Sequence, residues 1–514
     1  ANTLELEGKG QSVDLTLKGN VRTLTLRSNA VTDTGTEKNE ITSLTTDFAG
    51  LTGTPGTSAL RVNITGDKDL KIAAPVLPSN AVKGITINAA PFTAKLEATG
   101  TDQDDTFTSG TGDNIFIGRS GTNTFNAATG NDNFTGGKDK DTFIFDFANF
   151  NTSATDIDKV DGGDGIDTLQ FNGAVNVTTD ARAKDINDAA KLIEVLRLNS
   201  GTVDVAKITA VKDYEISGNV TVIGATESNK FTVLTNNSTV DISGAGQKVD
   251  LTLKGATVTA LTLQSSKGNA DPVPTNTVTQ LKADGSLTLT IDGVGGTDRD
   301  LVLAAPTLTE DSVFTLIANT FTAKLTATGG AGNDTLTGGT GSNTLTGGAG
   351  DDSLTGGVDK DSLTGGAGKD TLRGGAGADS LTGGTGNDIF AYDALIDSNA
   401  DTLIGANLTF DTITDFTKAQ DRINVAGLGF ASVVSAQAAV NATGITDIST
   451  APNFTTVLNA ASTAIDVDEL GYFVLGGNTY ILSDDDNNNL ATGNDLLIKL
   501  SGFSAGLAIT DFTV

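Results

Sequence analysis

A nine-residue frame, Gly-Gly-x-Gly-x-Asp-x-Leu-x, runs seven times in register over residues 329–391. Its large apolar position recurs every nine residues, at Leu336, Leu345, Leu354, Leu363, Leu372, Leu381 and Phe390. A more divergent version occupies 100–144, with Phe107, Phe116, Phe125, Phe134 and Phe143 at the apolar position. A disordered Gly- and Asp-rich linker would not keep such a phased column of large apolar residues. The frame therefore predicts two blocks of regularly repeating structure.

Each nonapeptide is predicted to form half a coil, made of a tight turn and a very short strand. Paired glycines such as Gly338–Gly339 permit a positive φ and let backbone carbonyls point inward. The Leu or Phe points into the coil and stacks on its counterpart two repeats away. Two nonapeptides complete one coil, so the pattern predicts a narrow parallel β-roll with an apolar core.

The sixth position of the frame holds an acid or an amide beside those carbonyls. Carboxylate and carbonyl oxygens form the hard, all-oxygen environment that calcium prefers. Adjacent coils should align these residues in one ladder of Asp334, Asp352, Asp370 and Asp388, and an opposite one of Asn343, Asp361 and Asp379. Without metal the stacked carboxylates repel and the slender core cannot offset chain entropy. We therefore predict that the block folds only when calcium binds.

The predicted calcium ligands are the sixth-position residues, further acids in the turns, and the second- and fourth-position glycines of the second block. In the first block and the isolated repeat that follows it they are Asp105, Asn114, Asn123, Asp132, Asp139, Asp141, Asp164 and Asp167. In the second block they are Gly330, Gly332, Asp334, Gly339, Gly341, Asn343, Gly348, Gly350, Asp352, Gly357, Asp359, Asp361, Gly366, Gly368, Asp370, Gly375, Gly377, Asp379, Gly384, Gly386 and Asp388.

Departures from the frame predict unequal sites. Asn114, Asn123 and Asn343 should be weaker ligands than aspartate, and acids replace the fourth-position glycine at Asp139 and Asp359. The first block is therefore expected to hold fewer ions than the second. The acidic run 484–486 with Asp495 is a further candidate ion site, although such a run is more often a solvated turn.

Composition narrows the function. A formal charge of −30, from 63 acids against 33 bases, disfavours nucleic acid, because phosphate binding needs clustered Lys and Arg. The chain has no Cys, so it forms no disulfides. It also has no His, which excludes Ser-His-Asp catalysis and the usual zinc sites. A carboxylate-only glycosidase is the remaining enzymatic alternative. Among the many Asp and Glu residues, no pair can be singled out as the two catalytic carboxylates. We therefore predict that the protein is not an enzyme.

The chain also carries an internal duplication. Residues 13–19 read VDLTLKG, and residues 249–255 read VDLTLKG again. Residues 92–100 (FTAKLEATG) match 321–329 (FTAKLTATG), and both copies lead directly into a nonapeptide block. We therefore predict that a strand module followed by a roll is used twice.

The predicted domains follow from this duplication. They are a first strand module (1–97), a first roll (98–146), a connecting β segment with one isolated repeat (147–199), a second strand module (200–328), a second roll (329–391) and a C-terminal β domain (392–514). Alternation such as Leu15–Leu17 predicts strands with one packed face and one wet face. An all-β parallel solenoid is favoured over a sandwich, because it continues into the rolls without exposing an edge. A short helix is predicted over 186–196.

The ends of the chain and its hydropathy carry further expectations. No stretch approaches the ~20 apolar residues of a membrane span, and no basic-then-apolar secretory signal opens the chain. The first residue, Ala1, is not an initiator, and the first copy of the duplication starts within a strand. We expect that the chain lacks an N-terminal region.

Together these features resemble the repeats-in-toxin (RTX) proteins exported by type I secretion. The resemblance is closest over 329–391 and 100–144, and it extends over 392–514. It implies that the repeats bind several calcium ions outside the cell, and that the exporter reads an uncleaved C-terminal segment. The sequence DTITDF (411–416) and the apolar residues after Asp511 resemble that segment. Low calcium inside the cell would keep the chain unfolded for export.

Within that family the acidic, duplicated, Thr- and Gly-rich chain resembles the surface-layer (S-layer) proteins of Gram-negative bacteria. This resemblance implies an extracellular protein that self-assembles with calcium into a lattice on the cell surface. It also implies attachment to surface polysaccharide through a separate N-terminal region. The alternative is an RTX adhesin or matrix protein, which would bind a surface target through loops and need no contact with its own copies.

Overall fold

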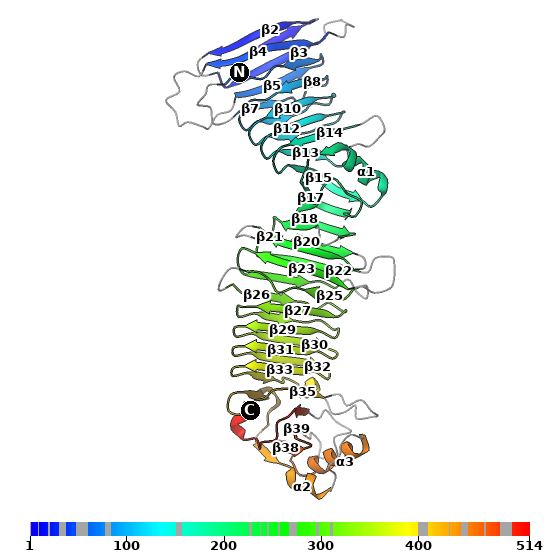
Figure 1. The fold of residues 1–514 in the computed structure, drawn as a ribbon, viewed down its shortest axis with the longest axis vertical. Coiled ribbons are helices and arrows are strands. Elements are labelled where there is room, and N and C mark those ends of the chain that lie inside the picture. Colours follow the sequence, from blue (N-terminus) through cyan, green and yellow to red (C-terminus); the bar gives the residue numbers. More distant parts are fainter. Residues whose placement is uncertain are drawn as a thin grey trace. The chain divides into compact units, whose positions relative to one another are not determined.

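The computed structural model describes most of the chain. The described residues are 2–8, 10–18, 21–29, 37–47, 60–77, 84–150, 157–225, 229–236, 238–243, 246–254, 258–266, 275–293, 298–308, 312–398, 410–430, 432–443, 451–466, 469–483 and 496–513. The acidic run 484–486 and Asp495 lie outside them. The chain divides into two compact units, Ala1–Thr232 and Val233–Val514 (Figure 1).

The first unit is a parallel β-solenoid in which the strands from β1 to β17 alternate between two ladders, and β18 follows β17 in the same ladder. One ladder contains β1 (Asn2–Glu7), β3 (Thr23–Asn29), β5 (Leu60–Gly66), β7 (Ile85–Asn88), β9 (Thr106–Thr108), β11 (Thr124–Asn126), β13 (Thr142–Asp146), β15 (Thr168–Val177), β17 (Val195–Asp204) and β18 (Asp213–Ile223). The other contains β2 (Ser12–Lys18), β4 (Asn39–Asp47), β6 (Leu70–Ile72), β8 (Leu96–Thr99), β10 (Ile115–Arg119), β12 (Asn133–Gly137), β14 (Lys159–Gly163) and β16 (Ala190–Lys191). Neighbouring strands pair in parallel along both ladders, as in β10 with β12. The predicted all-β parallel solenoid is confirmed.

The second unit repeats this architecture, and β19 (Lys230–Val233) spans the boundary between the units. One ladder contains β20 (Ser238–Ser243), β22 (Ala260–Ser266), β24 (Leu287–Ile291), β26 (Phe314–Ile317), β28 (Thr335–Thr337), β30 (Ser353–Val358), β32 (Thr371–Ala376), β34 (Ile389–Ala391), β36 (Arg422–Asn424) and β41 (Phe512–Thr513). The other contains β21 (Lys248–Leu253), β23 (Asn276–Ala283), β25 (Leu301–Leu303), β27 (Leu325–Gly330), β29 (Thr344–Ala349), β31 (Ser362–Ala367), β33 (Ser380–Thr385), β35 (Asp411–Ile413) and β40 (Leu497–Leu500).

A small subdomain completes the second unit. Strand β39 (Asn478–Leu482) pairs antiparallel with β40 and with β38 (Glu469–Leu475), and β37 (Ser432–Ser435) pairs in parallel with β38. The helices α2 (Gln437–Ala442) and α3 (Ala451–Ser462) belong to this subdomain. The short 3-10 helices η1 (Leu395–Ser398), η2 (Ala426–Leu428) and η3 (Ile509–Asp511) also follow the second roll in the chain, and η1 and η3 contact solenoid strands. Val440, Leu458 and Phe473 share one buried cluster, so the helices cover the sheet. The sequence pattern had predicted only β structure here.

The core of each roll is the expected column of large apolar side chains. In the first roll the rings stack, with centroid distances of 5.0 Å between Phe107 and Phe125 and 4.8 Å between Phe125 and Phe143. In the second roll Leu345, Leu363 and Leu381 align along one ladder, and each is fully buried. The rolls therefore bury a continuous but narrow apolar core, wider in the first roll, where the residues are phenylalanines.

The predicted helix over 186–196 is wrong. The helix α1 (Asp180–Ala189) begins earlier, where Thr179 accepts a hydrogen bond from the Arg182 amide. It ends where the chain enters β16, and Val195 already pairs in β17 with Thr168 of β15. The apolar spacing over 186–196 therefore reflects burial in successive elements, since pairing in the sheet overrides a weak helical pattern. Among the described residues, no helix is long and apolar enough to cross a membrane.

Candidate metal sites

The sixth-position acids of the second roll form the first expected ladder. One carboxylate oxygen, Oδ1, of each acid accepts a hydrogen bond from the backbone amide of the acid one coil earlier. The N–O distances are 2.8 Å from Asp334 to Asp352, 2.8 Å from Asp352 to Asp370 and 2.9 Å from Asp370 to Asp388. Every one of these side chains is buried. The structure thus aligns these four residues as the sequence predicts.

The opposite edge carries the second ladder. The amide of Asn343 donates to Asp361 Oδ1 at 2.6 Å, and the amide of Asp361 donates to Asp379 Oδ1 at 2.7 Å. Both ladders continue beyond the repeats. Asp379 donates to Asp411 Oδ1 at 2.8 Å, and the amide of Asp388 donates to Asp421 Oδ1 at 3.0 Å.

The same ladder arrangement holds in the first unit. The amide of Asp141 donates to Asp167 Oδ1 at 2.7 Å, and the amide of Asp132 donates to Asp158 Oδ1 at 3.0 Å. Glu194 ends the first of these ladders by accepting from the amide of Asp167 at 2.8 Å.

Sequence reasoning did not reveal Asp158, Glu194, Asp411 or Asp421, because their segments lack the glycine pair. A shorter signal is nevertheless present. Each begins an acid-x-apolar triplet, as in Asp411–Ile413. The same triplet also occurs elsewhere, as in 292–294, so it does not identify these residues by itself.

The second carboxylate oxygen is the unusual feature of these ladders. Within the described part of the chain, Oδ2 is buried and has no hydrogen-bond partner at Asp141, Asp167, Asp334, Asp352, Asp361, Asp370, Asp379, Asp388 and Asp411. Burying an unsatisfied carboxylate oxygen is costly. Nine such atoms at repeating positions fit a site for bound cations.

Backbone carbonyls share the space around these oxygens. A Cβ atom placed on Gly347 would lie 2.2 Å from Asp352 Oδ2 and 2.7 Å from the Gly365 carbonyl oxygen. The first-position glycine is thus required for a close approach, and it brings two acceptors toward one small space. A Cβ atom on the second-position Gly348 (φ +124°) would lie 2.0 Å from the Gly330 oxygen, so the turns of adjacent coils also touch.

The electrostatics of the ladders favour a bound cation. Burial, together with the charges of Asp370 and Asp334, raises the pKa of Asp352 to about 7. Burial also raises the pKa of Asp361 to about 7, with added repulsion from Asp379. Burial and then the charge of Asp379 raise the pKa of Asp411 well above its usual range. A cation between the coils would relieve the cost of ionising these groups near neutral pH.

The donor set fits calcium. Among the described residues, no three His, Cys, Asp or Glu side chains converge on one point as a metal cluster. An ion in the rolls would therefore take few carboxylates and draw its other ligands from turn carbonyls, which suits a hard cation of flexible geometry. In the second roll, the acids with an unpartnered Oδ2 and the neighbouring glycine carbonyls would hold it.

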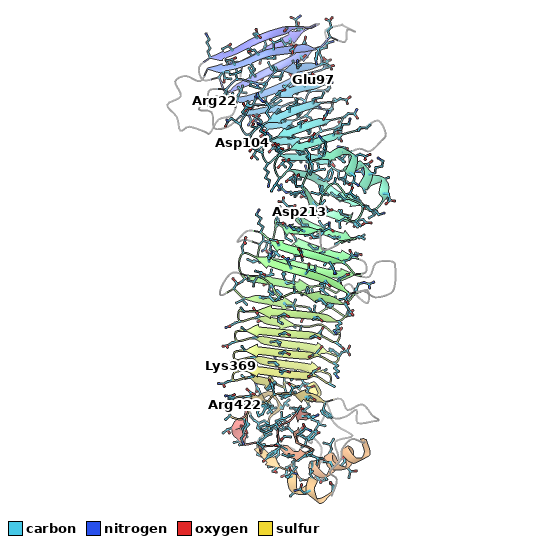
Figure 2. The ribbon with its side chains drawn as sticks, viewed as in Figure 1. Arg22, Glu97, Asp104, Asp213, Lys369 and Arg422 are labelled. Carbon is cyan, nitrogen blue, oxygen red and sulfur yellow. The ribbon has the colours of Figure 1, made fainter. Side chains whose placement is uncertain are left out.

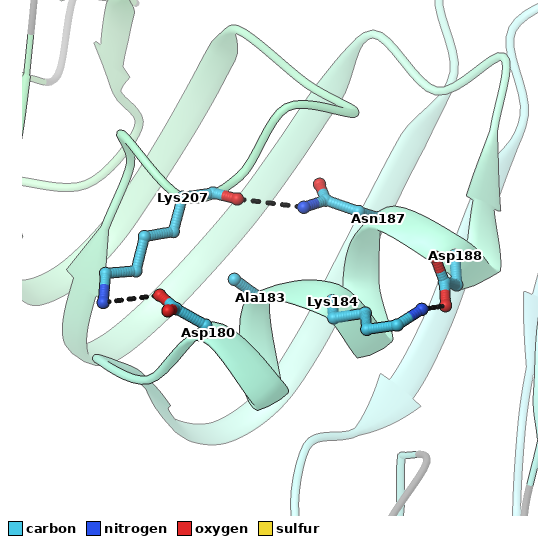
Figure 3. A pocket seen from close by; sticks show the side chains of 6 residues that line it. All are labelled: Asp180, Ala183, Lys184, Asn187, Asp188 and Lys207. Carbon is cyan, nitrogen blue, oxygen red and sulfur yellow. Dashed lines mark hydrogen bonds and ion pairs between the residues drawn. The ribbon is translucent and has the colours of Figure 1, made fainter.

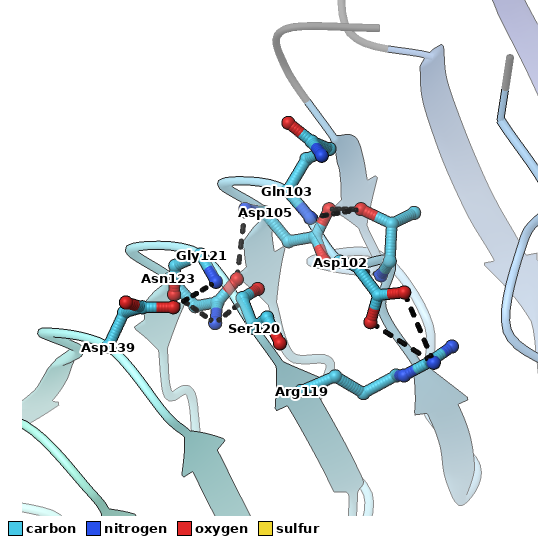
Figure 4. A network of polar contacts seen from close by, with 9 residues as sticks. Asp102, Gln103, Asp105, Arg119, Ser120, Gly121, Asn123 and Asp139 are labelled. Carbon is cyan, nitrogen blue, oxygen red and sulfur yellow. Dashed lines mark hydrogen bonds and ion pairs between the residues drawn. The ribbon is translucent and has the colours of Figure 1, made fainter. Parts of the chain in front are cut away.

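Three predicted turn ligands lie apart from the buried ladders. Asp139, Asp164 and Asp359 are exposed. Asp139 accepts from the Gly121 amide at 2.8 Å (Figure 4), and Asp359 has a left-handed φ of +63°. The structure thus gives Asp139 a role in joining adjacent turns, and the role of all three as ligands stays a prediction.

In the first roll, four sixth-position residues form more hydrogen bonds within the protein than the sixth-position aspartates of the second roll. Asp105 and Asp132 are buried like the others, yet both of their carboxylate oxygens accept hydrogen bonds. The amide nitrogens of Asn114 and Asn123 donate to carbonyl oxygens of their own turns. These four residues are therefore satisfied by the protein.

A hollow beside α1 offers a second concave surface (Figure 3). Its charged side chains pair with one another: Lys184 contacts Asp188, and Lys207 lies 2.8 Å from Asp180. Asn187 donates to the Lys207 carbonyl oxygen at 2.9 Å. These contacts are those of an ordinary polar surface that fixes α1 on the solenoid.

Fold and buried carboxylates together define a calcium-binding β-roll protein. The family model of the RTX calcium-binding nonapeptide repeat (4 copies) matches residues 99–134, 117–149, 328–363, 355–390 and 364–398. The two blocks are therefore RTX repeats, and they bind calcium ions. A search of curated proteins found no match. RTX-repeat proteins are typically secreted.

Proposed function

We propose that this protein is a structural, non-enzymatic S-layer protein that calcium folds and assembles into a two-dimensional lattice on the bacterial surface. The observation that carries the proposal is the duplicated strand module. A chain with two copies of one solenoid surface can meet its neighbours through repeated heterologous contacts. Such contacts build open arrays when they do not close on themselves.

The duplication extends to buried polar details of the two modules. In the first, buried Asn39 donates through Nδ2 to Ser28 Oγ at 3.0 Å. In the second, buried Asn276 donates to Ser265 Oγ at 3.0 Å. The pairing of β2 with β4 and of β21 with β23 also shifts at the same place, where Thr42 of β4 and Thr279 of β23 are the extra residues. Because these networks fix the local backbone, the two modules should present similar outer faces.

Charge supports a role for calcium in the assembly. Surface ion pairs such as Lys38 with Glu97 (2.5 Å) neutralise some acids, but acids exceed bases by 30 over the whole chain. Charged side chains, including Asp104 and Lys369 at turns of the two rolls, occur on both units (Figure 2). Like-charged copies repel one another. Calcium can bridge acids from two subunits, whereas ordinary salt only screens them.

The proposal includes the export route. Low calcium inside the cell leaves the acids of the second roll without their cation, so the roll stays unfolded and can pass a type I exporter. The segment 411–416 and the C-terminal residues would carry the export signal. Calcium outside the cell then folds the second roll. Attachment to surface polysaccharide completes the proposal.

Electron microscopy of the purified chain tests this function. Negative-stain images in about 5 mM calcium should contain sheets or extended oligomers, because calcium both folds the second roll and bridges acids. Sodium chloride of matched ionic strength is the control and should give none. Light scattering that finds only monomer in calcium at high protein concentration would contradict lattice formation. It would favour the adhesin, which needs no contact with its own copies.

A further inference from the structure

We infer that a glycine pair followed by an acid decides which nonapeptides require calcium in this chain, so that the two rolls depend on the ion differently. On this view the second roll needs calcium for its fold, whereas the first coils of the first roll are closed by protein donors. The inference rests on calcium binding by the repeats and does not depend on lattice formation.

Within the nonapeptides, the glycine pair separates the two kinds of site; Asp411, which lies beyond the nonapeptides, has a buried Oδ2 without a hydrogen-bond partner and no such pair before it. Eight sixth-position acids follow a Gly-Gly pair, and all eight have a buried Oδ2 with no partner within the described part of the chain: Asp141, Asp167, Asp334, Asp352, Asp361, Asp370, Asp379 and Asp388. The two sixth-position acids that do not follow such a pair, Asp105 and Asp132, are fully hydrogen-bonded. The correlation has a direct chemical cause in the residues that replace glycine.

Ser109 and Thr101 supply the missing donors. Ala127 and Ala128 replace the glycine pair of the Asp132 repeat. The donor is Ser109, which occupies the first-position glycine site of the preceding coil, and its Oγ donates to Asp132 Oδ2 at 3.0 Å. Thr101 occupies a second-position glycine site. Its backbone amide donates to Asp105 Oδ2 at 2.6 Å, and its Oγ1 donates to Asp105 Oδ1 at 2.9 Å. Each of these hydrogen-bond donors stabilises the carboxylate, as a bound cation would at the glycine-paired sites.

The asparagines close their turns in another way. Asn123 Nδ2 donates to the Gly121 oxygen at 2.9 Å (Figure 4), and Asn114 Nδ2 donates to the Gly110 oxygen at 3.2 Å. A Cβ atom on Gly118 would lie 2.5 Å from Asn123 Nδ2, which is the place that Oδ2 takes at an aspartate site. The amide therefore presents N–H groups to carbonyls that would otherwise face a carboxylate. These asparagines act as metal-free closures rather than weak ligands.

A fixed positive charge reinforces this closure. Arg119 occupies the second-position glycine site with a left-handed φ of +84°. Its guanidinium lies 3.1 Å from Asp102 on the preceding coil (Figure 4). Neighbouring turns of the first roll are thus joined by a side-chain cation that the chain carries itself.

The apolar core of the first roll is also larger. Phe107, Phe116, Phe125 and Phe134 are fully buried and stack at 5.0–5.5 Å between ring centroids. Phenylalanine buries more apolar area than the leucines of the second roll, and stacked rings add attraction. Coils over 100–135 therefore have both satisfied polar groups and a stronger core. Calcium dependence in the first unit should begin at Gly136–Gly137, with the unpartnered oxygen of Asp141.

Hydrogen exchange of the full chain, read by mass spectrometry, tests the difference between the rolls. On moving from millimolar calcium to chelator, peptides from 329–391 should exchange at least ~10-fold faster, because that roll loses its cations. Peptides from 100–135 should change less than about twofold under the same conditions. Equal deprotection of both segments would overturn the inference. So would unchanged protection of 329–391.

A matched pair of variants tests the sites themselves. Native mass spectrometry should count fewer calcium ions in Asp352→Asn, where a glycine-paired carboxylate is lost. Asp132→Asn should leave the count unchanged, because Ser109 already occupies that carboxylate. Asn343→Asp should add one ion, since Asn343 follows Gly338–Gly339 and lacks only the charge. An equal loss in Asp352→Asn and Asp132→Asn, with both variants folded in calcium by circular dichroism, would contradict the rule.

Discussion

The sixth-position aspartate uses its two oxygens for different purposes. At Asp370, Oδ1 accepts the amide of Asp352 and so fixes the register of two coils. Its Oδ2 is buried without a partner in the described part of the chain. One oxygen is therefore satisfied by folding alone, and the other requires a cation. This division couples register to ion binding in a single side chain.

Removing one such carboxylate should weaken calcium binding across the ladder. We expect Asp370→Ala to lower the calcium affinity of the second roll by about tenfold or more, because a ligand and an amide acceptor are lost together. Asn123→Ala is the comparison, and it should leave that affinity within about twofold, since its amide serves turn carbonyls. Calcium titration followed by calorimetry measures both. Equal affinity in the two variants would contradict the assignment.

The raised pKa values predict that, without metal, the second roll is more stable at acidic pH than at neutral pH. Asp352 and Asp361 have ordinary values of 3.8 that burial raises to about 7 in the fold. The folded state thus binds more protons than the unfolded chain. The contribution of these two groups to the free energy of unfolding is fully present below about pH 3.8. It is lost as pH rises through about 7.

In chelator, the second roll should therefore keep part of its β structure and show a thermal transition near pH 5, where its acids are protonated, and should lose both near pH 8. In saturating calcium the order should reverse, because protons compete with the ion. A second roll that is less stable at pH 5 than at pH 8 in chelator would argue against the buried, unpartnered carboxylates.

At the scale of the coil, the apolar column is as necessary as the ion. Leu363 is fully buried between Leu345 and Leu381 of the neighbouring coils. We expect Leu363→Ala to cost about 2–5 kcal/mol in calcium, because a cavity in so narrow a core cannot collapse. The exposed neighbour Ser362 is the control, and Ser362→Ala should change stability by less than about 0.5 kcal/mol. Chemical denaturation of both variants measures the difference.

Much of the coil could be predicted from the sequence because its period is short and strict. A nine-residue repeat places Leu345 over Leu363 whatever the remainder of the chain does. The continuation of the ladders at Asp411 was missed because no glycine marks it. The closure of Asp132 by Ser109 could not be predicted, since it depends on which side chains face each other across coils. The helix α1 lies earlier in the chain than predicted, because pairing of Val195 in the sheet outweighs the helical spacing of the apolar residues.

At the scale of the whole molecule, folding should follow calcium in part rather than completely. Circular dichroism in chelator should lose the β signal of the second roll and keep that of the metal-free coils. Millimolar calcium should restore the signal, and equal magnesium should restore it poorly, because its small octahedral shell suits carbonyl-rich turns badly. Equal recovery of the β signal in calcium and in magnesium would contradict sites built from turn carbonyls and carboxylates. A spectrum unchanged by chelator would contradict calcium-dependent folding of the second roll.

The ladders also give the solenoid a direction. Each sixth-position acid accepts from the coil before it, so the sixth-position amide of each coil depends on the coil that follows. At the C-terminal end Asp411 supplies the last acceptor of one ladder. The amide of Asp411 is itself bound by Ser398 Oγ at 2.8 Å, and Ser398 donates to the Leu497 carbonyl. A folded C-terminal segment therefore presents a ready row of acceptors to the next coil upstream. It can serve as the template on which the roll grows toward its N-terminal side.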